Sequence, residues 1–111
     1  MKLLVCGTRN AKYDEKEVLA QIDKVRPTVI IEGCCTNSAD VIAEKYARLD
    51  IEVRHEHFPS NTGNYLKRNV EMVNKCDCVL AFWDGWSYGT AHTIAQAVLK
   101  GKNVAIILVK R

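Results

Sequence analysis

The sequence predicts an α/β fold: a single three-layer domain built on a five-stranded parallel sheet with helices on both faces. The chain has 111 residues, which is the size of one domain. Short apolar runs alternate with stretches whose apolar residues recur at helical spacing. The strand-like runs are continuously apolar, which is typical of strands buried on both faces.

The first half of the chain gives two strands and two helices. Leu3–Cys6 predicts a strand that Gly7 ends, and Val18, Leu19, Ile22 and Val25 form one face of a helix. Pro27 stops that helix because proline lacks an amide donor and its ring clashes with the preceding turn. Thr28–Ile31 is a β-branched strand run, and the next helical face spans Val41–Leu49.

The second half repeats the alternation. The expected elements are a strand beginning at Ile51–Val53, a loop over His57–Asn64, a helix marked by Leu66, Val70 and Val73, a strand over Cys78–Phe82, a helix over Ile94–Val98 and a last strand over Val104–Val109. Lys100 and Gly101 give the last helix a basic end and a C-terminal glycine. Strands that alternate with helices imply right-handed crossovers and a Rossmann-like sheet.

The composition narrows the class of protein. Hydrophobic residues make up 48% and charged residues 26%, which is typical of globular domains. A formal net charge of +3 is too weak to indicate nucleic acid by itself, and it suits an anionic small ligand equally well. The chain lacks the run of roughly 18 apolar residues that a membrane helix needs. Met1–Gly7 is too short and too quickly polar for a signal peptide, so the expected location is the cytoplasm.

The five cysteines favour free thiols. An odd number without a secretion signal argues against a disulfide framework. The pairs Cys34-Cys35 and Cys76-x-Cys78 raise the alternative of a metal site. The strand order puts Cys6, Cys34 and Cys35 at one edge of the sheet and the other pair at the opposite edge, so no metal is expected.

The residues most unusual for a plain scaffold gather after the strands. Open parallel sheets bind ligands outside the carboxyl ends of their strands. Four loops are expected at that rim: Gly7–Asn10, Gly33–Asp40, Phe58–Asn64 and Trp83–Thr90. The opposite rim holds ordinary turns such as Arg26-Pro27 and Gly101-Lys102. This asymmetry predicts a ligand site at the carboxyl rim.

An anion is the ligand chemistry that this rim favours. Gly85–Thr90 leads into a helix, and a helix start offers backbone N–H donors and a partial positive charge. Ser87 and Thr90 add hydroxyl donors, although a tight turn with a Ser or Thr cap explains the same residues. Arg9 and Arg68 are candidates for bidentate phosphate binding, with a solvated surface charge as the common alternative.

Other residues at the rim have two interpretations each. Asp40 is explained by helix capping or by holding ligand hydroxyls or the neighbouring loops. Trp83, Trp86 and Tyr88 suit either stacking on a base or covering the sheet edge. His92, in the first turn of the last helix, is a candidate ligand contact.

Four motifs together resemble a known family, the SLOG superfamily, and most closely its YspA-like, YpsA-related branch of small bacterial and phage proteins. They are Val5–Arg9, Glu32-Gly33 through Asp40, Lys67–Met72 and Ser87–Thr90, and they cover nearly the whole chain in the right order. The resemblance implies a Rossmann-like sheet and a nucleotide-derived ligand. LOG-type phosphoribohydrolases, which cleave the N-glycosidic bond of nucleoside monophosphates, are more distantly similar; other members are thought to bind nucleotide or ADP-ribose-like signals.

The chain departs from the hydrolases at a chemically important position. They carry a glutamate three residues after the Gly-Thr threonine, and here that position is Thr93. Glycosidic hydrolysis usually needs a carboxylate, which leaves Glu71 and Asp40 as candidate catalytic residues. The Gly33–Asp40 loop is also one residue longer than in the YspA-like branch and lacks its arginine and inner glycines.

We therefore expect a nucleotide-binding protein, a sensor or a sequestering protein, with weak or no catalysis. The alternatives are an N-glycosidic-bond hydrolase of nucleoside monophosphates and a protein-interaction module with a degenerate pocket. No cofactor and no nucleic acid or membrane partner is expected, and the related hydrolases imply a homodimer or a higher homo-oligomer. The expected ligand-binding residues are Gly7, Thr8, Arg9, Gly33, Asp40, Arg68, Asn69, Gly85, Trp86, Ser87, Gly89 and Thr90.

Overall fold

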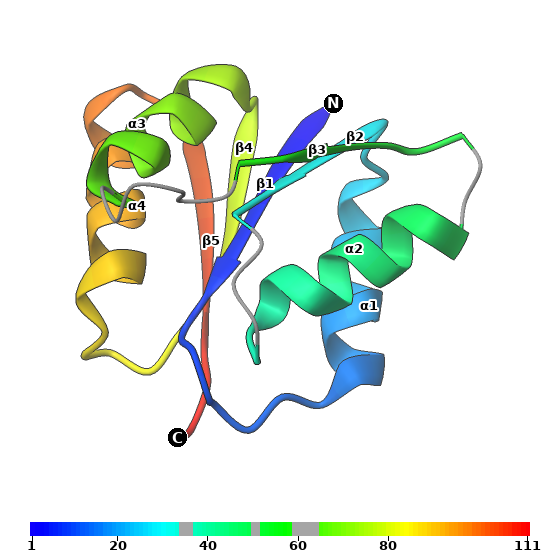
Figure 1. The fold of residues 1–111 in the computed structure, drawn as a ribbon, viewed down its shortest axis with the longest axis horizontal. Helices are drawn as coiled ribbons and strands as arrows, with labels where there is room; N and C mark the ends of the chain where they lie inside the picture. Colours follow the sequence, from blue (N-terminus) through cyan, green and yellow to red (C-terminus); the bar gives the residue numbers. More distant parts are fainter. Residues whose placement is uncertain (34–36, 50–51, 59–64) are drawn as a thin grey trace.

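The strands form one parallel sheet in the order β3-β2-β1-β4-β5. The computed structural model describes residues 1–33, 37–49, 52–58 and 65–111. Its elements are β1 (Lys2–Gly7), α1 (Glu15–Val25), β2 (Val29–Glu32), α2 (Ala39–Leu49), β3 (Arg54–His57), α3 (Tyr65–Lys75), β4 (Cys78–Trp83), α4 (Tyr88–Leu99) and β5 (Asn103–Leu108). Helices α1 and α2 cover one face of the sheet and α3 and α4 cover the other (Figure 1). The predicted three-layer α/β fold is confirmed.

Two apolar cores hold the layers together. Side chains alternate across a strand, so Leu3 and Val5 of β1 pack toward α1 and α2, whereas Leu4 packs toward α3 and α4. All three are fully buried, as the continuous apolar run predicts. At roughly 1.5–3 kcal/mol for each large apolar side chain, this burial is the main source of stability for the sheet.

The helix ends follow the local signals. The Asp14 side chain accepts the Lys16 and Glu17 amides at the start of α1, and Arg26 ends that helix in the left-handed region just before Pro27. Gly101 adopts φ 71°, which allows two backbone hydrogen bonds to close the end of α4. The Gly101 amide donates to Val98 O, and the Lys102 amide donates to Ala97 O. The predicted glycine stop is confirmed.

The third strand differs from its prediction. It runs over Arg54–His57, whereas Glu52 lies in a turn. This strand is at the sheet edge and pairs only with β2, so it needs no continuous apolar run. The expected start at Ile51 falls outside the described residues.

The cysteines take the expected positions where they are described. Cys6 lies near the carboxyl end of β1, and Cys76 and Cys78 lie at the amino end of β4. Cys34 and Cys35 fall outside the described residues. Within the described ranges, no group of three or more His, Cys, Asp or Glu side chains is arranged to hold a metal. No described helix is both long and apolar enough to cross a membrane.

Candidate functional site

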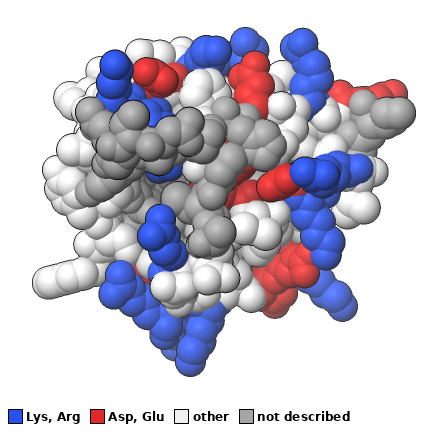
Figure 2. All heavy atoms as spheres, in the orientation of Figure 1, with Lys and Arg blue, Asp and Glu red and all other residues white. Residues whose placement is uncertain are grey.

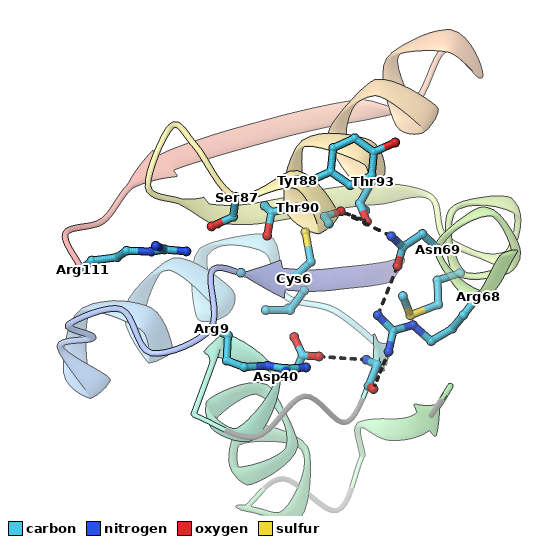
Figure 3. Close-up of a pocket in the computed structure, with 15 residues that line it drawn as sticks. Cys6, Arg9, Asp40, Arg68, Asn69, Ser87, Tyr88, Thr90, Thr93 and Arg111 are labelled. Carbon is cyan, nitrogen blue, oxygen red and sulfur yellow. Dashed lines mark hydrogen bonds between the residues drawn. The ribbon is translucent and has the colours of Figure 1, made fainter. Parts of the chain in front are cut away.

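A pocket of about 550 Å³ opens at the carboxyl rim of the sheet, which is the lower edge in Figure 1. Its size falls within the usual range for small-molecule sites. Side chains from the ends of β1 and β2, from the pocket side of α3 and from the start of α4 surround it (Figure 3). The lining residues are Val5, Cys6, Gly7, Arg9, Gly33, Asp40, Arg68, Asn69, Met72, Ser87, Tyr88, Gly89, Thr90, Thr93 and Arg111.

Thr8 joins the loops that frame the pocket. It is 1% exposed, and its amide donates to Phe82 O at 2.8 Å. Its carbonyl accepts the Tyr13 hydroxyl at 2.7 Å, and its Oγ1 accepts the Asp84 amide at 3.0 Å. Thr8 therefore positions the β1 and β4 loops, and its side chain does not line the pocket where a ligand would contact it.

Asp84 organises the start of α4. Its Oδ1 accepts the amides of Trp86 at 2.9 Å and Ser87 at 2.7 Å, and the Ser87 hydroxyl lies 2.8 Å away. The backbone N–H of Ser87 is the main reason that the pKa of the Asp84 carboxyl lies well below its ordinary value. The carboxylate is thus ionised, and Arg111 Nε lies 2.8 Å from Oδ2.

Asp40 and Arg68 both bind the backbone of Gly33, directly after β2. The Asp40 carboxylate accepts the Gly33 amide at 3.1 Å, and Arg68 Nη1 donates to the Gly33 carbonyl at 3.1 Å. Arg68 Nη2 also donates to Asn69 Oδ1 at 3.3 Å. The Asp40 carboxylate therefore contacts the backbone directly after β2, and the Asp40 amide itself donates to Ser38 Oγ at 3.2 Å.

The first turn of α4 lines the pocket through Ser87, Gly89 and Thr90. Ser87 is its N-cap residue, but its side chain makes no capping hydrogen bond to the helix. The Gly89 carbonyl accepts Asn69 Nδ2 at 3.3 Å and the Thr93 hydroxyl at 3.2 Å. The Thr93 hydroxyl thus stabilises the helix itself, and Asn69 fixes α3 against α4.

Most of the predicted ligand-binding residues come together at this pocket. The structure brings together Gly7, Arg9, Gly33, Asp40, Arg68, Asn69, Ser87, Gly89 and Thr90. Among the remaining predictions, Gly85 is an exposed turn residue at φ 83°, and Trp86 is 85% exposed outside the pocket lining. Glu71 is exposed on α3 and does not line the pocket, so the catalytic role expected for its carboxylate has no support from the pocket geometry.

Six lining residues are outside the list of expected ligand-binding residues: Val5, Cys6, Met72, Tyr88, Thr93 and Arg111. Of these, Tyr88 has the base-stacking interpretation that the sequence offers, together with that of covering the sheet edge. The two β1 residues and Met72 carry ordinary core signals, so no pattern in the sequence marks them. Arg111 lies beyond the last strand, and its carboxyl-rim position was the only available signal. His92 does not line the pocket; its Nδ1 lies 3.4 Å from Asn69 Nδ2.

The charge around the pocket favours anions. Three guanidinium groups line it, from Arg9, Arg68 and Arg111, and among the described lining residues Asp40 supplies the carboxylate. A group of Lys and Arg side chains lies along the lower edge of the molecule in Figure 2, the same edge as the carboxyl rim. Arginines and helix N-termini are groups that proteins use to hold phosphate.

No protein-family model, curated protein or solved structure matches the chain. The resemblance to the SLOG superfamily therefore stays a prediction that rests on the four sequence motifs. The geometry of the pocket is the independent argument about function.

Proposed function

We propose that the protein binds a nucleotide-derived small molecule, a nucleotide or an ADP-ribose-like signal, and acts in the cytoplasm as a sensor or a sequestering protein. One observation carries the proposal: Arg9, Arg68 and the start of α4 all line a single pocket at the carboxyl rim. Rossmann-like sheets bind nucleotides at this rim.

The start of α4 supports the phosphate end of such a ligand. Ser87, Gly89 and Thr90 line the pocket at the first turn of the helix, where backbone donors and the helix dipole favour negative charge. Asp84 holds this turn from outside the pocket lining. The turn is therefore organised before any ligand arrives, which lowers the entropic cost of binding.

Arg68 supports the same assignment from the opposite wall. Its guanidinium is oriented by two acceptors, Gly33 O at 3.1 Å and Asn69 Oδ1 at 3.3 Å. A planar group fixed in this way binds phosphate with defined geometry.

Binding without strong catalysis fits the acidic groups better than hydrolysis does. Asp40 lines the pocket, but it is 4% exposed and holds the Gly33 amide. The hydrolase alternative now rests on Asp40 rather than Glu71. Incubation with nucleoside monophosphates, followed by chromatography for free base, decides it: base released by the protein and lost in Asp40→Asn would favour the enzyme.

Titration calorimetry tests the main proposal. The protein is titrated with nucleoside mono- and diphosphates, cyclic nucleotides and ADP-ribose, and we expect at least one to bind with a dissociation constant below the millimolar range. A hundredfold excess over that constant raises the free energy of unfolding by about 2.7 kcal/mol, which a thermal-shift assay detects. If no member of the panel binds at millimolar concentration, the proposal is wrong.

We also propose that the protein self-associates through α4 and β5. Tyr88, Val98 and Leu99 are 64%, 63% and 78% exposed, and α4 carries no charged residue. Beside it, Ile106 and Leu108 of the edge strand β5 are 47% and 74% exposed. An exposed apolar face of this kind is typical of an interface between subunits.

A further inference from the structure

Arg111 enters the pocket from the end opposite Arg68 (Figure 3). Arg68 is held beside Gly33, which follows β2, whereas Arg111 follows β5. In the order β2-β1-β4-β5, three interstrand spacings separate these strands, which amounts to about 14 Å. The two guanidinium groups therefore reach the pocket from its two ends, with Arg9 on the β1 side between them.

The Arg111 guanidinium is oriented by only one of its nitrogens. Its Nε lies 2.8 Å from Asp84 Oδ2, and within the described part of the chain the structure gives its two Nη groups no partner. Asp84 is itself fixed, because its Oδ1 accepts the amides of Trp86 and Ser87. The loop that starts α4 thus holds Arg111 in place and leaves four N–H donors of its fork for another acceptor.

A single phosphate does not use both ends of this pocket. Two adjacent phosphates, which share one bridging oxygen, form one compact anionic group and suit one end. Phosphates attached to two different positions of a sugar are further apart, so one can reach each end of the pocket. The placement of Arg68 and Arg111 at opposite ends of the pocket (Figure 3) therefore distinguishes between classes of nucleotide.

We propose that Arg111 is a second anion-binding residue of the pocket, and that the ligand is a nucleotide with phosphates at two separated positions, of the nucleoside 3′,5′-bisphosphate class. This inference rests on the proposed nucleotide-binding function. A purely structural role for Arg111, in which it only pairs with Asp84, makes a different prediction: its loss lowers stability without changing the preference among nucleotides.

Calorimetry with matched nucleotides separates these roles. The full chain, Arg111→Gln and Lys110→Gln are each titrated with a nucleoside 5′-monophosphate, its 5′-diphosphate and its 3′,5′-bisphosphate, in adenosine and guanosine series at one ionic strength. Lys110 is the control because it is exposed, adjacent and cationic but does not line the pocket. We expect the wild type and Lys110→Gln to bind the bisphosphate about tenfold more tightly than the monophosphate, the effect of one charge-assisted contact. In Arg111→Gln this preference falls to twofold or less.

Each other outcome contradicts the inference in an identifiable way. Equal weakening of all three nucleotides in Arg111→Gln would place both arginines on one phosphate. A lower Tm with an unchanged preference would leave Arg111 a purely structural role. Tighter binding of the 5′-diphosphate than of the bisphosphate by the wild type would overturn the ligand class while the nucleotide pocket stands. If none of the nucleotides binds the wild type, the proposed function itself fails and this inference with it.

Discussion

Thr8 and Ser87 are joined by a hydrogen bond between their hydroxyl oxygens, 3.1 Å apart, although 79 positions separate them in the sequence. The bond connects the loop after β1 to the start of α4, on the rim where Gly7 and Gly89 line the pocket. The loop after β1 and the start of α4 are therefore one connected unit, and changes in either should affect the other.

Replacement of Arg68 should weaken nucleotide binding selectively. The Arg68→Gln variant loses charge-assisted hydrogen bonds, each worth about 1.5–3 kcal/mol, so we expect affinity to fall roughly 10- to 100-fold. Calorimetry measures the change, and Lys67→Gln, an exposed neighbour outside the pocket lining, is the matched control. Equal losses in the two variants would mean that general charge, and not the Arg68 contact, attracts the ligand.

Two glycines at the pocket should respond differently to alanine. A Cβ at Gly7 would meet the Tyr13 hydroxyl and lie 3.1 Å from Phe82 O, so Gly7→Ala should destabilise the fold by about 1–3 kcal/mol. A Cβ at Gly33 would instead lie 3.0 Å from the Arg68 Cζ, and that flexible side chain can shift. Gly33→Ala should therefore lower nucleotide affinity more than stability. Denaturant unfolding and calorimetry on both variants check this contrast, which a uniform loss of stability would refute.

Asp84 should make the stability of the protein sensitive to acid. Because the pKa of its carboxyl is lowered in the folded state, its contribution is present above the ordinary value of 3.8 and is lost as pH falls below it. The Tm of the wild type should exceed that of Asp84→Asn at pH 7, and the difference should shrink between pH 4 and pH 2. Thermal unfolding across this range measures it; a constant difference would show that the ionised form of Asp84 contributes nothing.

The Cys76 thiol should react slowly with alkylating reagents in the folded protein. Burial raises its pKa from 9.0 to about 11, so at pH 8 the reactive thiolate fraction is about a hundredfold lower than for an ordinary cysteine. Alkylation at pH 8, followed by peptide mass spectrometry, compares native with denatured protein. The same shift should cost stability as pH rises above 9, because the unfolded chain then ionises first. Native labelling at the denatured rate would contradict the burial of this thiol.

Charge on the apolar face of α4 should disrupt self-association. Leu99→Glu places a carboxylate where self-association would bury an apolar side chain, so the dissociation constant between subunits should rise by at least tenfold. Sedimentation equilibrium over a range of protein concentrations gives the mass. Leu49→Glu is the control because Leu49 is equally apolar and 73% exposed on α2, over the other face of the sheet. A wild type that stays monomeric at high micromolar concentration would rule the interface out.

The sequence predicts the sheet better than it predicts the site. Buried strands such as Val29–Glu32 can be predicted from their apolar runs. Arg54–His57 is polar, and it forms a strand by pairing with β2 at the edge of the sheet. At the rim, the loops were predictable because they follow strands, but the direction of each side chain was not. Thr8 and Arg9 are neighbours, yet one is buried between loops and the other lines the pocket.

The same difficulty explains the missed Arg111. Its importance depends on Asp84, a residue 27 positions earlier that is fixed by the amides of its own loop. Sequence spacing does not reveal this ion pair because it depends on β4 and β5 lying side by side.

The hydrogen bond from the Trp83 indole Nε1 to the Ser87 carbonyl, at 3.0 Å, gives the protein a built-in optical reporter. The chain has two tryptophans, and the other, Trp86, is almost fully exposed. In Trp86→Phe the remaining indole is attached directly to the first turn of α4, so its emission should follow occupancy of the pocket without any added dye.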